Sequence, residues 1–107
     1  MKKQEQKLIN ERCMIAYENA IEEMENEGII DVKRLRSCSA VVIETDNYYI
    51  LRSYSTIIAV IDKTFDTLYD VLRVVYGYTA TSAQHISKFD KDYCLGAWGC
   101  TERLTAR

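Results

Sequence analysis

The chain has 107 residues, of which 48% are hydrophobic and 28% charged, and its formal net charge is −2 at pH 7. This length predicts a single domain over residues 1–107, and the composition is that of a globular rather than a disordered protein. The slight acidity excludes a global field that attracts nucleic acid, so such binding would need a local basic patch. No stretch approaches the roughly 20 apolar residues of a membrane span, and no apolar run follows the N-terminal lysines. We therefore expect a cytoplasmic protein that does not contact membranes.

The first predicted element is an amphipathic helix over residues 3–26. Its apolar residues recur at spacings of three and four, opposite a face rich in glutamate. Gly28 follows the last apolar position and is expected to end the helix. The apolar stripe could also pack against a second copy, so a homodimer through this helix is one possibility.

Runs of β-branched and aromatic residues predict antiparallel strands within residues 40–76. The predicted strands are Ala40–Ile43, Tyr48–Tyr54, Thr56–Ile61 and Leu68–Tyr76. The last of these could also be a short helix, although its valines favour a strand. The segment Ile29–Arg36 is ambiguous, and a short helical turn capped by Asp31 is one interpretation.

A second, shorter helix is predicted over residues 81–91. Thr81 and Gln84 have the spacing of a capping box, in which a hydroxyl and an amide satisfy the first backbone amides of the helix. Residues 95–104 form a possible edge strand with Trp98 packed on it. The predicted fold class is α+β, with a long N-terminal helix and a second short helix packed on a three- to five-stranded antiparallel sheet. The predicted core comprises Ile9, Ala16, Tyr17, Ile21, Val42, Ile50, Ile58, Val60, Leu72, Ile86 and Phe89.

The four cysteines predict neither a metal site nor a cofactor. Cys13, Cys38, Cys94 and Cys100 form no C-x-x-C pair, and the chain has one histidine. In a cytoplasmic protein we expect reduced and mostly buried thiols. Cys94 and Cys100 are the pair to test for a bond.

Two stretches together resemble a group of proteins. The residues LRSYSTIIAVID at Leu51–Asp62 contain an S-Y-x-T-x-[IV]-A strand, and YGYTATSAQHISKF at Tyr76–Phe89 forms a turn and helix. The combination resembles small uncharacterised proteins of phages and integrative elements of Gram-positive bacteria. The resemblance implies a genomic setting, and the cytoplasm of a host cell, rather than a reaction.

His85 is the first candidate for chemistry. A histidine on the first turn of a helix, near strand hydroxyls, could act as a base in a hydrolase. Such a pair normally needs a carboxylate that orients the imidazole ring, and the spacing selects none. The alternative is that His85 hydrogen-bonds a strand residue and stabilises the turn. We assign no catalytic residue and predict a protein that is not an enzyme.

Tyrosines and small hydroxylic residues form the second candidate. Such residues make adaptable contact surfaces, and they could equally form a polar network between strand and helix cap. The candidates for binding a ligand or partner are Arg52, Tyr54, Ser55, Tyr76, Tyr78, Thr79 and His85.

Basic residues form the third candidate, with Lys33, Arg34 and Arg36 in one short segment. They could contact phosphates, although the chain carries no nucleic-acid-binding motif. The small size, the absence of a catalytic motif and the resemblance favour a non-enzymatic interaction protein that binds and modulates a host protein, with defence components among the candidate targets. The alternatives are a small nucleic-acid-binding accessory protein, or a binder of a small nucleotide signal whose pocket is lined by Tyr54, Tyr78 and His85.

Overall fold

The computed structural model describes residues 3–36 and 39–107. Its centre is a six-stranded sheet in which the strands lie side by side in sequence order. The first five strands pair antiparallel, whereas the sixth lies parallel to the fifth. The elements are α1 (Lys3–Glu25), β1 (Ile29–Arg34), β2 (Ala40–Thr45), β3 (Tyr48–Ser53), β4 (Thr56–Asp62), β5 (Thr67–Asp70), α2 (Leu72–Val75), α3 (Ala80–Tyr93) and β6 (Glu102–Thr105). The α+β class is confirmed. The prediction of three to five antiparallel strands is wrong in two respects: the sheet has six strands, and β6 pairs parallel with β5.

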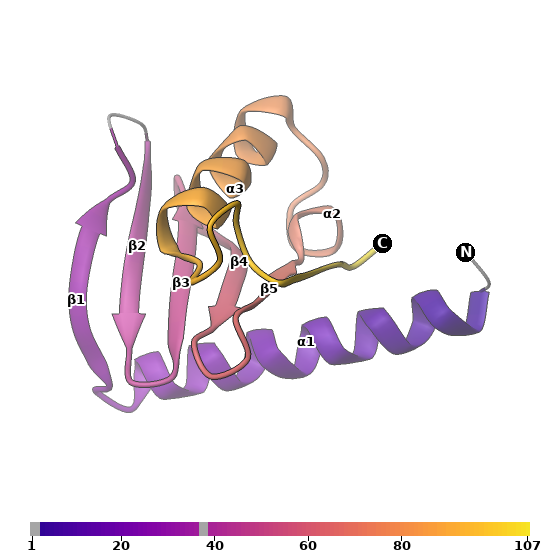
Figure 1. Cartoon of the computed structure of the whole chain (residues 1–107), viewed down its shortest axis with the longest axis horizontal. Coiled ribbons are helices and arrows are strands. Elements are labelled where there is room, and N and C mark those ends of the chain that lie inside the picture. Colours follow the sequence, from indigo (N-terminus) through magenta and orange to yellow (C-terminus); the bar gives the residue numbers. More distant parts are fainter. Residues whose placement is uncertain (1–2, 37–38) are drawn as a thin grey trace.

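The sheet separates two helical layers (Figure 1). Small side chains of α1, including Cys13, Ala16 and Ala20, pack on one face against Ile50 and Val60. The other face packs against α2 and α3 through a second cluster of buried residues, among them Leu51, Leu72, Ile86 and Phe89. Eight of the eleven predicted core residues are buried, whereas Ile9, Tyr17 and Ile21 are half-buried at the margin of α1. No helix within residues 3–36 or 39–107 is long and apolar enough to cross a membrane.

The end of α1 shows why a glycine follows it. The amide of Gly28 donates to the carbonyl of Glu23 at 3.1 Å, and a Cβ atom on Gly28 would lie 2.6 Å from that oxygen. Only glycine permits this approach, so the predicted helix stop is confirmed. The chain then enters β1 rather than the short helical turn that was one interpretation of Ile29–Arg36.

The predicted strand Leu68–Tyr76 is wrong in its second half. β5 ends at Asp70, whose Oδ1 atom accepts the amide of Leu72 at 3.0 Å. This side-chain bond turns the backbone into the single turn of α2, which was the alternative interpretation. The four residues of β5 are all buried, because β4 and β6 flank the strand and helices lie on both faces.

The second helix, α3, begins one residue before its predicted start and ends two residues after its predicted end, and its N-cap lies two residues earlier than expected. Thr79, and not Thr81, is the N-cap: its hydroxyl accepts the amide of Ser82 at 3.2 Å. Ile86 and Phe89, which were predicted to lie in the core, are buried on the inward face of this helix together with Ser82 and His85.

The C-terminal segment differs most from prediction. β6 covers four residues rather than the whole of 95–104, and the Trp98 side chain is 96% exposed instead of packed on the sheet. Cys94 and Cys100 are joined in a disulfide, so the expectation of reduced thiols is wrong for this pair. The end of α3 and the turn after it bring the two Cα atoms to 4.7 Å. Cys38 lies outside the described residues, as does the part of the predicted structure that falls on residues 1, 2 and 37.

Candidate functional site

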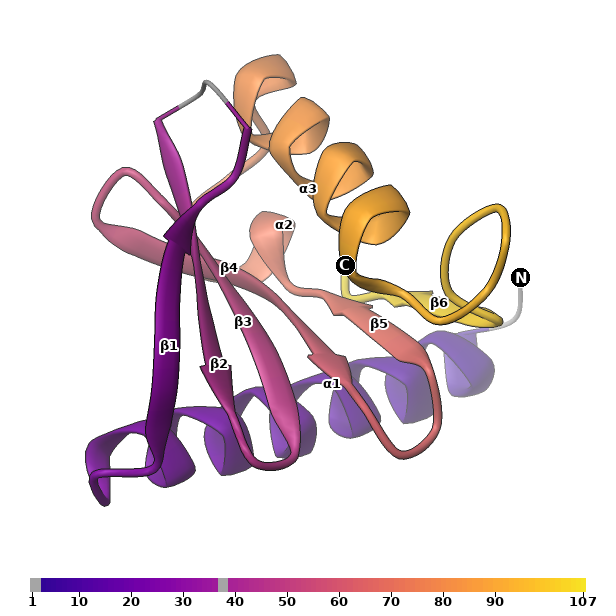
Figure 2. The same cartoon turned by 60° about the vertical axis from the view of Figure 1, so that its left-hand side comes forward.

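The outer strand β1 is the largest uncovered element of the sheet. It lies at one edge, far from β6 at the other (Figure 2). Every residue of β1 is exposed except Asp31, which is half-buried. Ile29, Ile30 and Val32 are apolar side chains that are each about half exposed. An uncovered outer strand of this kind presents unpaired backbone groups to a partner.

Hydrogen bonds show which backbone groups of β1 point outward. The amide of Leu35 donates to Ala40 of β2 at 2.9 Å, whereas the amide of Val32 donates to the side chain of Asp31 at 2.9 Å. Residues of an antiparallel strand alternate between facing the partner strand and facing away from it. The amides of Val32 and Arg34 therefore face the open edge. Sequence reasoning missed this edge because its charged residues resemble those of a turn.

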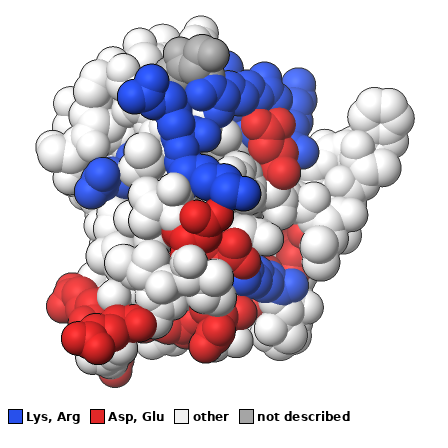
Figure 3. All heavy atoms as spheres, turned by 90° about the vertical axis from the view of Figure 1, so that its left-hand side faces the viewer, with Lys and Arg blue, Asp and Glu red and all other residues white. Residues whose placement is uncertain are grey.

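The three predicted basic residues lie at and just after the end of β1. Figure 3 shows the face of the molecule on the side where β1 lies in Figure 1. Lys and Arg gather in the upper part of this face, whereas Asp and Glu gather in its lower part. Arg36 forms a two-bond contact with Asp92 at 2.8 and 2.7 Å, which lowers the pKa of Asp92. The Nζ atom of Lys33 lies 3.4 Å from Oδ2 of Asp31, so these two side chains also form an ion pair. These pairs leave less of the basic charge available than the sequence suggests.

One further arginine, Arg52, extends this basic group. Arg34 of β1 is level with Val41 of β2, and Val41 is level with Arg52 of β3. Cross-strand neighbours share a face of the sheet, so Arg34 and Arg52 lie on the same face with one strand between them. Within residues 3–36 and 39–107, neither Arg34 nor Arg52 makes an ion pair.

His85 is buried and its contact is with a strand residue. Its Nδ1 atom lies 2.9 Å from Ser53 Oγ, which lies 3.2 Å from Ser82 Oγ. Burial lowers the pKa of His85, and the charge of Lys88 lowers it further. Among the described residues, no carboxylate pairs with the ring. The arrangement holds α3 against β3, in agreement with the structural alternative for His85.

The predicted tyrosine surface divides into two groups. Tyr54 lies in the turn between β3 and β4 beside the exposed Ser55, and its ring centroid is 6.2 Å from that of His85. Tyr78 lies between α2 and α3, where Arg73 lies over its ring at 4.8 Å. Both tyrosines, and Tyr76, are more than half exposed. Tyr54 has a φ of +56°, a left-handed conformation that costs free energy for a residue other than glycine.

The disulfide lies beside a buried carboxylate, that of Asp66. Asp66 lies within 4.8 Å of the Cys94 and Cys100 sulfurs, a grouping that could hold a metal if the cysteines were reduced. The Asp66 carboxylate already accepts the amides of Leu95 and Thr101 at 2.7 and 3.2 Å. Because the sulfurs are joined and the carboxylate is hydrogen-bonded, this cluster stabilises the turn that follows α3.

A comparison with known families assigns the chain. Residues 9–104 match the model of a family of unknown function, DUF8033. The chain belongs to this family. No curated protein and no solved structure matches the chain.

The DUF8033 match begins within α1 and ends in β6, so it includes β1, Ser53, His85 and the exposed tyrosines. Arg107 lies outside it. Apart from the open edge of β1, this DUF8033 chain has a hollow of about 410 Å³ between α1 and β5. Arg12 lines that hollow, but its guanidinium is paired with Glu102 at 3.2 Å. The hollow therefore offers no unpaired charge from Arg12.

Proposed function

We propose that the protein is a non-enzymatic interaction protein of a phage or mobile element, which binds a host protein at the open edge of β1. The observation that carries the proposal is that β1 is an outer strand whose residues are exposed except for the half-buried Asp31, with no covering helix among the described residues. The genomic setting rests on the resemblance of the segments Leu51–Asp62 and Tyr76–Phe89.

Strand addition is the binding mode that fits this edge. An extended peptide segment that pairs with an outer strand gains main-chain hydrogen bonds, while side-chain contacts supply specificity. The outward amides of Val32 and Arg34 provide the backbone partners, and Ile30 and Val32 provide apolar contact area.

The charge of the edge favours an acidic segment of the partner. Arg34 and Arg52 share one face and make no ion pair within the described residues. Opposite charges across an interface raise the association rate and select the partner. The occupant we propose is therefore an extended, acidic segment of a host protein.

Two features of β1 oppose unspecific pairing. The ladder between β1 and β2 is interrupted between Ile29 and Asp31, and the Asp31 side chain accepts a hydrogen bond from the amide of Val32. Irregular pairing and charged side chains are common protections of outer strands against aggregation. The partner must displace the Asp31 oxygen to pair fully. Defence components of the host are among the candidate partners.

The environment of His85 supports the non-enzymatic part of the proposal. The Ser53–His85 pair is buried, and among the described residues it lacks the carboxylate that a catalytic triad would contain. A base in this position would also have to reach a substrate through the α3–β3 contact.

The test is a tagged pull-down from host lysate with Val32→Pro and Val32→Ala beside the unmodified chain. Proline removes an amide donor that β2 does not use, so the sheet remains paired, whereas alanine keeps the donor and trims the side chain. We expect one host protein, retained after nuclease treatment, that Val32→Pro loses and Val32→Ala keeps. Arg34→Glu should weaken the same capture, and this variant serves if proline prevents folding.

Three outcomes contradict the proposal. Equal capture by the unmodified chain, Val32→Pro and Arg34→Glu would place the partner elsewhere. Material lost on nuclease treatment would favour the nucleic-acid alternative. A dimer in solution that Val32→Pro converts to a monomer would mean that a second copy, and not a host protein, occupies β1.

A further inference from the structure

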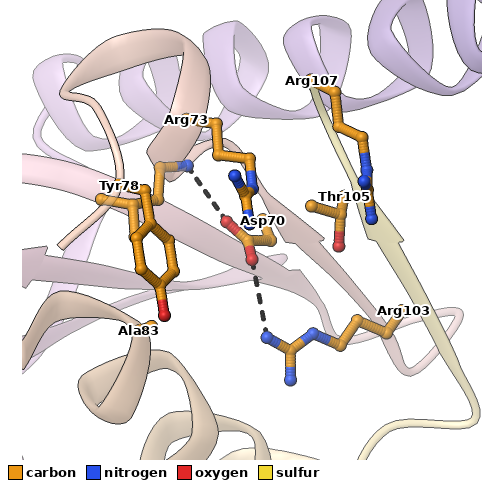
Figure 4. Close-up of a pocket in the computed structure, with 8 residues that line it drawn as sticks. Asp70, Arg73, Tyr78, Ala83, Arg103, Thr105 and Arg107 are labelled. Carbon is orange, nitrogen blue, oxygen red and sulfur yellow. Dashed lines mark hydrogen bonds and ion pairs between the residues drawn. The ribbon is translucent and has the colours of Figure 1, made fainter. Parts of the chain in front are cut away.

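A second, independent feature lies at the opposite end of the sheet from β1. A cavity of about 200 Å³ lies between α2, the beginning of α3 and the C-terminal strand β6. Figure 4 shows the side chains of Arg73, Arg103 and Arg107 around Asp70, with Tyr78 at the side of the cavity. Arg73 belongs to α2, whereas Arg103 and Arg107 lie in and just after β6, and the fold brings these two segments together.

The charges in this cavity do not balance. Among the described side chains that line it, Asp70 is the one carboxylate, so three guanidinium groups against one carboxylate leave a side-chain charge of 3 − 1 = +2. Asp70 is buried, and its Oδ1 atom is already bonded to the amide of Leu72. Its Oδ2 atom lies 3.5 Å from Arg103, whose other terminal nitrogen lies 3.8 Å from Asp90 outside the lining.

The other two arginines are available to a ligand. Within the described ranges 3–36 and 39–107, Arg73 and Arg107 make no ion pair. Arg12 is different, because it lines its own hollow and is paired there with Glu102. Converging guanidinium groups without an acidic partner suit an anion, and a phosphoryl group matches the planar fork of arginine.

Tyr78 indicates what the phosphoryl group is attached to. One face of its ring is covered by Arg73 at 4.8 Å, yet the side chain remains 57% exposed. Exposed aromatic rings next to phosphate-binding arginines stack on nucleobases. The cavity is smaller than the roughly 300–1,000 Å³ of clefts that enclose a whole ligand, so a base would lie at the rim and not inside.

We propose that Arg73, Arg103 and Arg107 bind the phosphoryl group of a phosphate monoester, and that Tyr78 stacks on the base of a nucleotide that carries it. The site lies beside β6, at the far edge of the sheet from β1. It is therefore independent of the partner surface, and either proposal can fail alone. Tyr54 and His85, the other residues expected in a nucleotide pocket, do not line this cavity.

The experiment is a titration of the full chain, by calorimetry at low salt, with inorganic phosphate, adenosine monophosphate and adenosine in separate arms. We expect saturable binding of phosphate and of the nucleotide with Kd below about 1 mM, tighter binding of the nucleotide, and no binding of adenosine at that level. Arg73→Gln and Arg107→Gln should each weaken phosphate binding by about ten-fold, since a charge-assisted hydrogen bond contributes about that much. Arg12→Gln is the control, because Arg12 lies outside the cavity and is paired with Glu102, and it should bind phosphate as the unmodified chain does.

Tyr78→Leu separates the two parts of the site. It should weaken the nucleotide and leave inorganic phosphate unchanged. Equal effects on both ligands, or none on the nucleotide, would overturn the stacking role of Tyr78. No saturable binding of phosphate or nucleotide, binding of adenosine equal to that of the nucleotide, or an equal loss in Arg12→Gln would overturn the phosphoryl site itself.

Discussion

The Nδ1 atom of His85 lies 2.9 Å from the hydroxyl oxygen of Ser53, and both side chains are buried between α3 and β3. The same hydroxyl also contacts Ser82, so removal of the Ser53 oxygen leaves two buried polar groups without this partner. We expect Ser53→Ala to lower the free energy of unfolding by about 1–3 kcal/mol, which urea denaturation measures. Ser87→Ala, on the exposed side of α3, is the control and should change it little. Equal stability of the two variants would contradict a structural role for the Ser53–His85 contact.

The stability of the protein should depend on pH through His85. Burial, and then the charge of Lys88, lower the pKa of His85 below its ordinary value of 6.5. The unfolded chain therefore takes up the proton at a higher pH than the folded chain. This contribution to stability is complete above the unfolded value and is lost as the pH falls through it toward the folded pKa. Denaturation at about pH 7.5 and about pH 5 should show a fall in the free energy of unfolding that His85→Gln reduces. An equal fall in both proteins would assign the pH dependence to other groups.

The N-cap of α3 gives a direct test of where that helix begins. The hydroxyl of Thr79 accepts the amide of Ser82, whereas Thr81 lies within the first turn and is exposed. Thr79→Ala should lower the free energy of unfolding by about 1 kcal/mol. Thr81→Ala should lower it by less, because alanine favours the helix interior. The reverse order in thermal or urea denaturation would restore the predicted start at Thr81.

The disulfide predicts a count of reactive thiols. Alkylation of the non-reduced protein in denaturant should add two groups, and alkylation after reduction should add four, because the chain contains four cysteines and one pair is joined. Reduction should also lower the free energy of unfolding by about 2 kcal/mol, since the bond closes a short loop. Cys100→Ser should abolish the effect of the reductant on stability.

Four alkyl groups without reduction would show that the thiols are free in the purified protein. Cys13 should react slowly in the folded protein in either case, because burial raises the pKa of its thiol to about 11.

The elements that the sequence predicted correctly are those with a local signal. The apolar stripe of α1 follows from burial of one face, which repeats every three to four residues in a helix. β2 and β3 carry runs of β-branched and aromatic residues, and the structure buries side chains on both of their faces. β1 has no such buried face, because both of its faces meet water. β6 pairs parallel with β5, a strand more than thirty residues earlier, and no local sequence pattern predicts that pairing.

The candidate sites show the same division. Tyr54 and His85 lie in the two separate stretches that carry the resemblance, and the structure places their ring centroids 6.2 Å apart. The cavity near Asp70 combines arginines at positions 73, 103 and 107, which only the folding of β6 against β5 brings together. The two threonines at positions 79 and 81 both suit an N-cap chemically, and the backbone path from α2 decides between them.

The most direct measurement is amide hydrogen exchange of β1, made on the free protein and on its complex with the captured host protein. The outward amides of Val32 and Arg34 should exchange quickly in the free protein, because β2 does not bond them. If the host segment adds as a strand, both amides should become strongly protected in the complex, while amides of β6 at the far edge remain unchanged. Unchanged exchange at Val32 and Arg34 in a complex that forms would contradict docking on the open edge of β1.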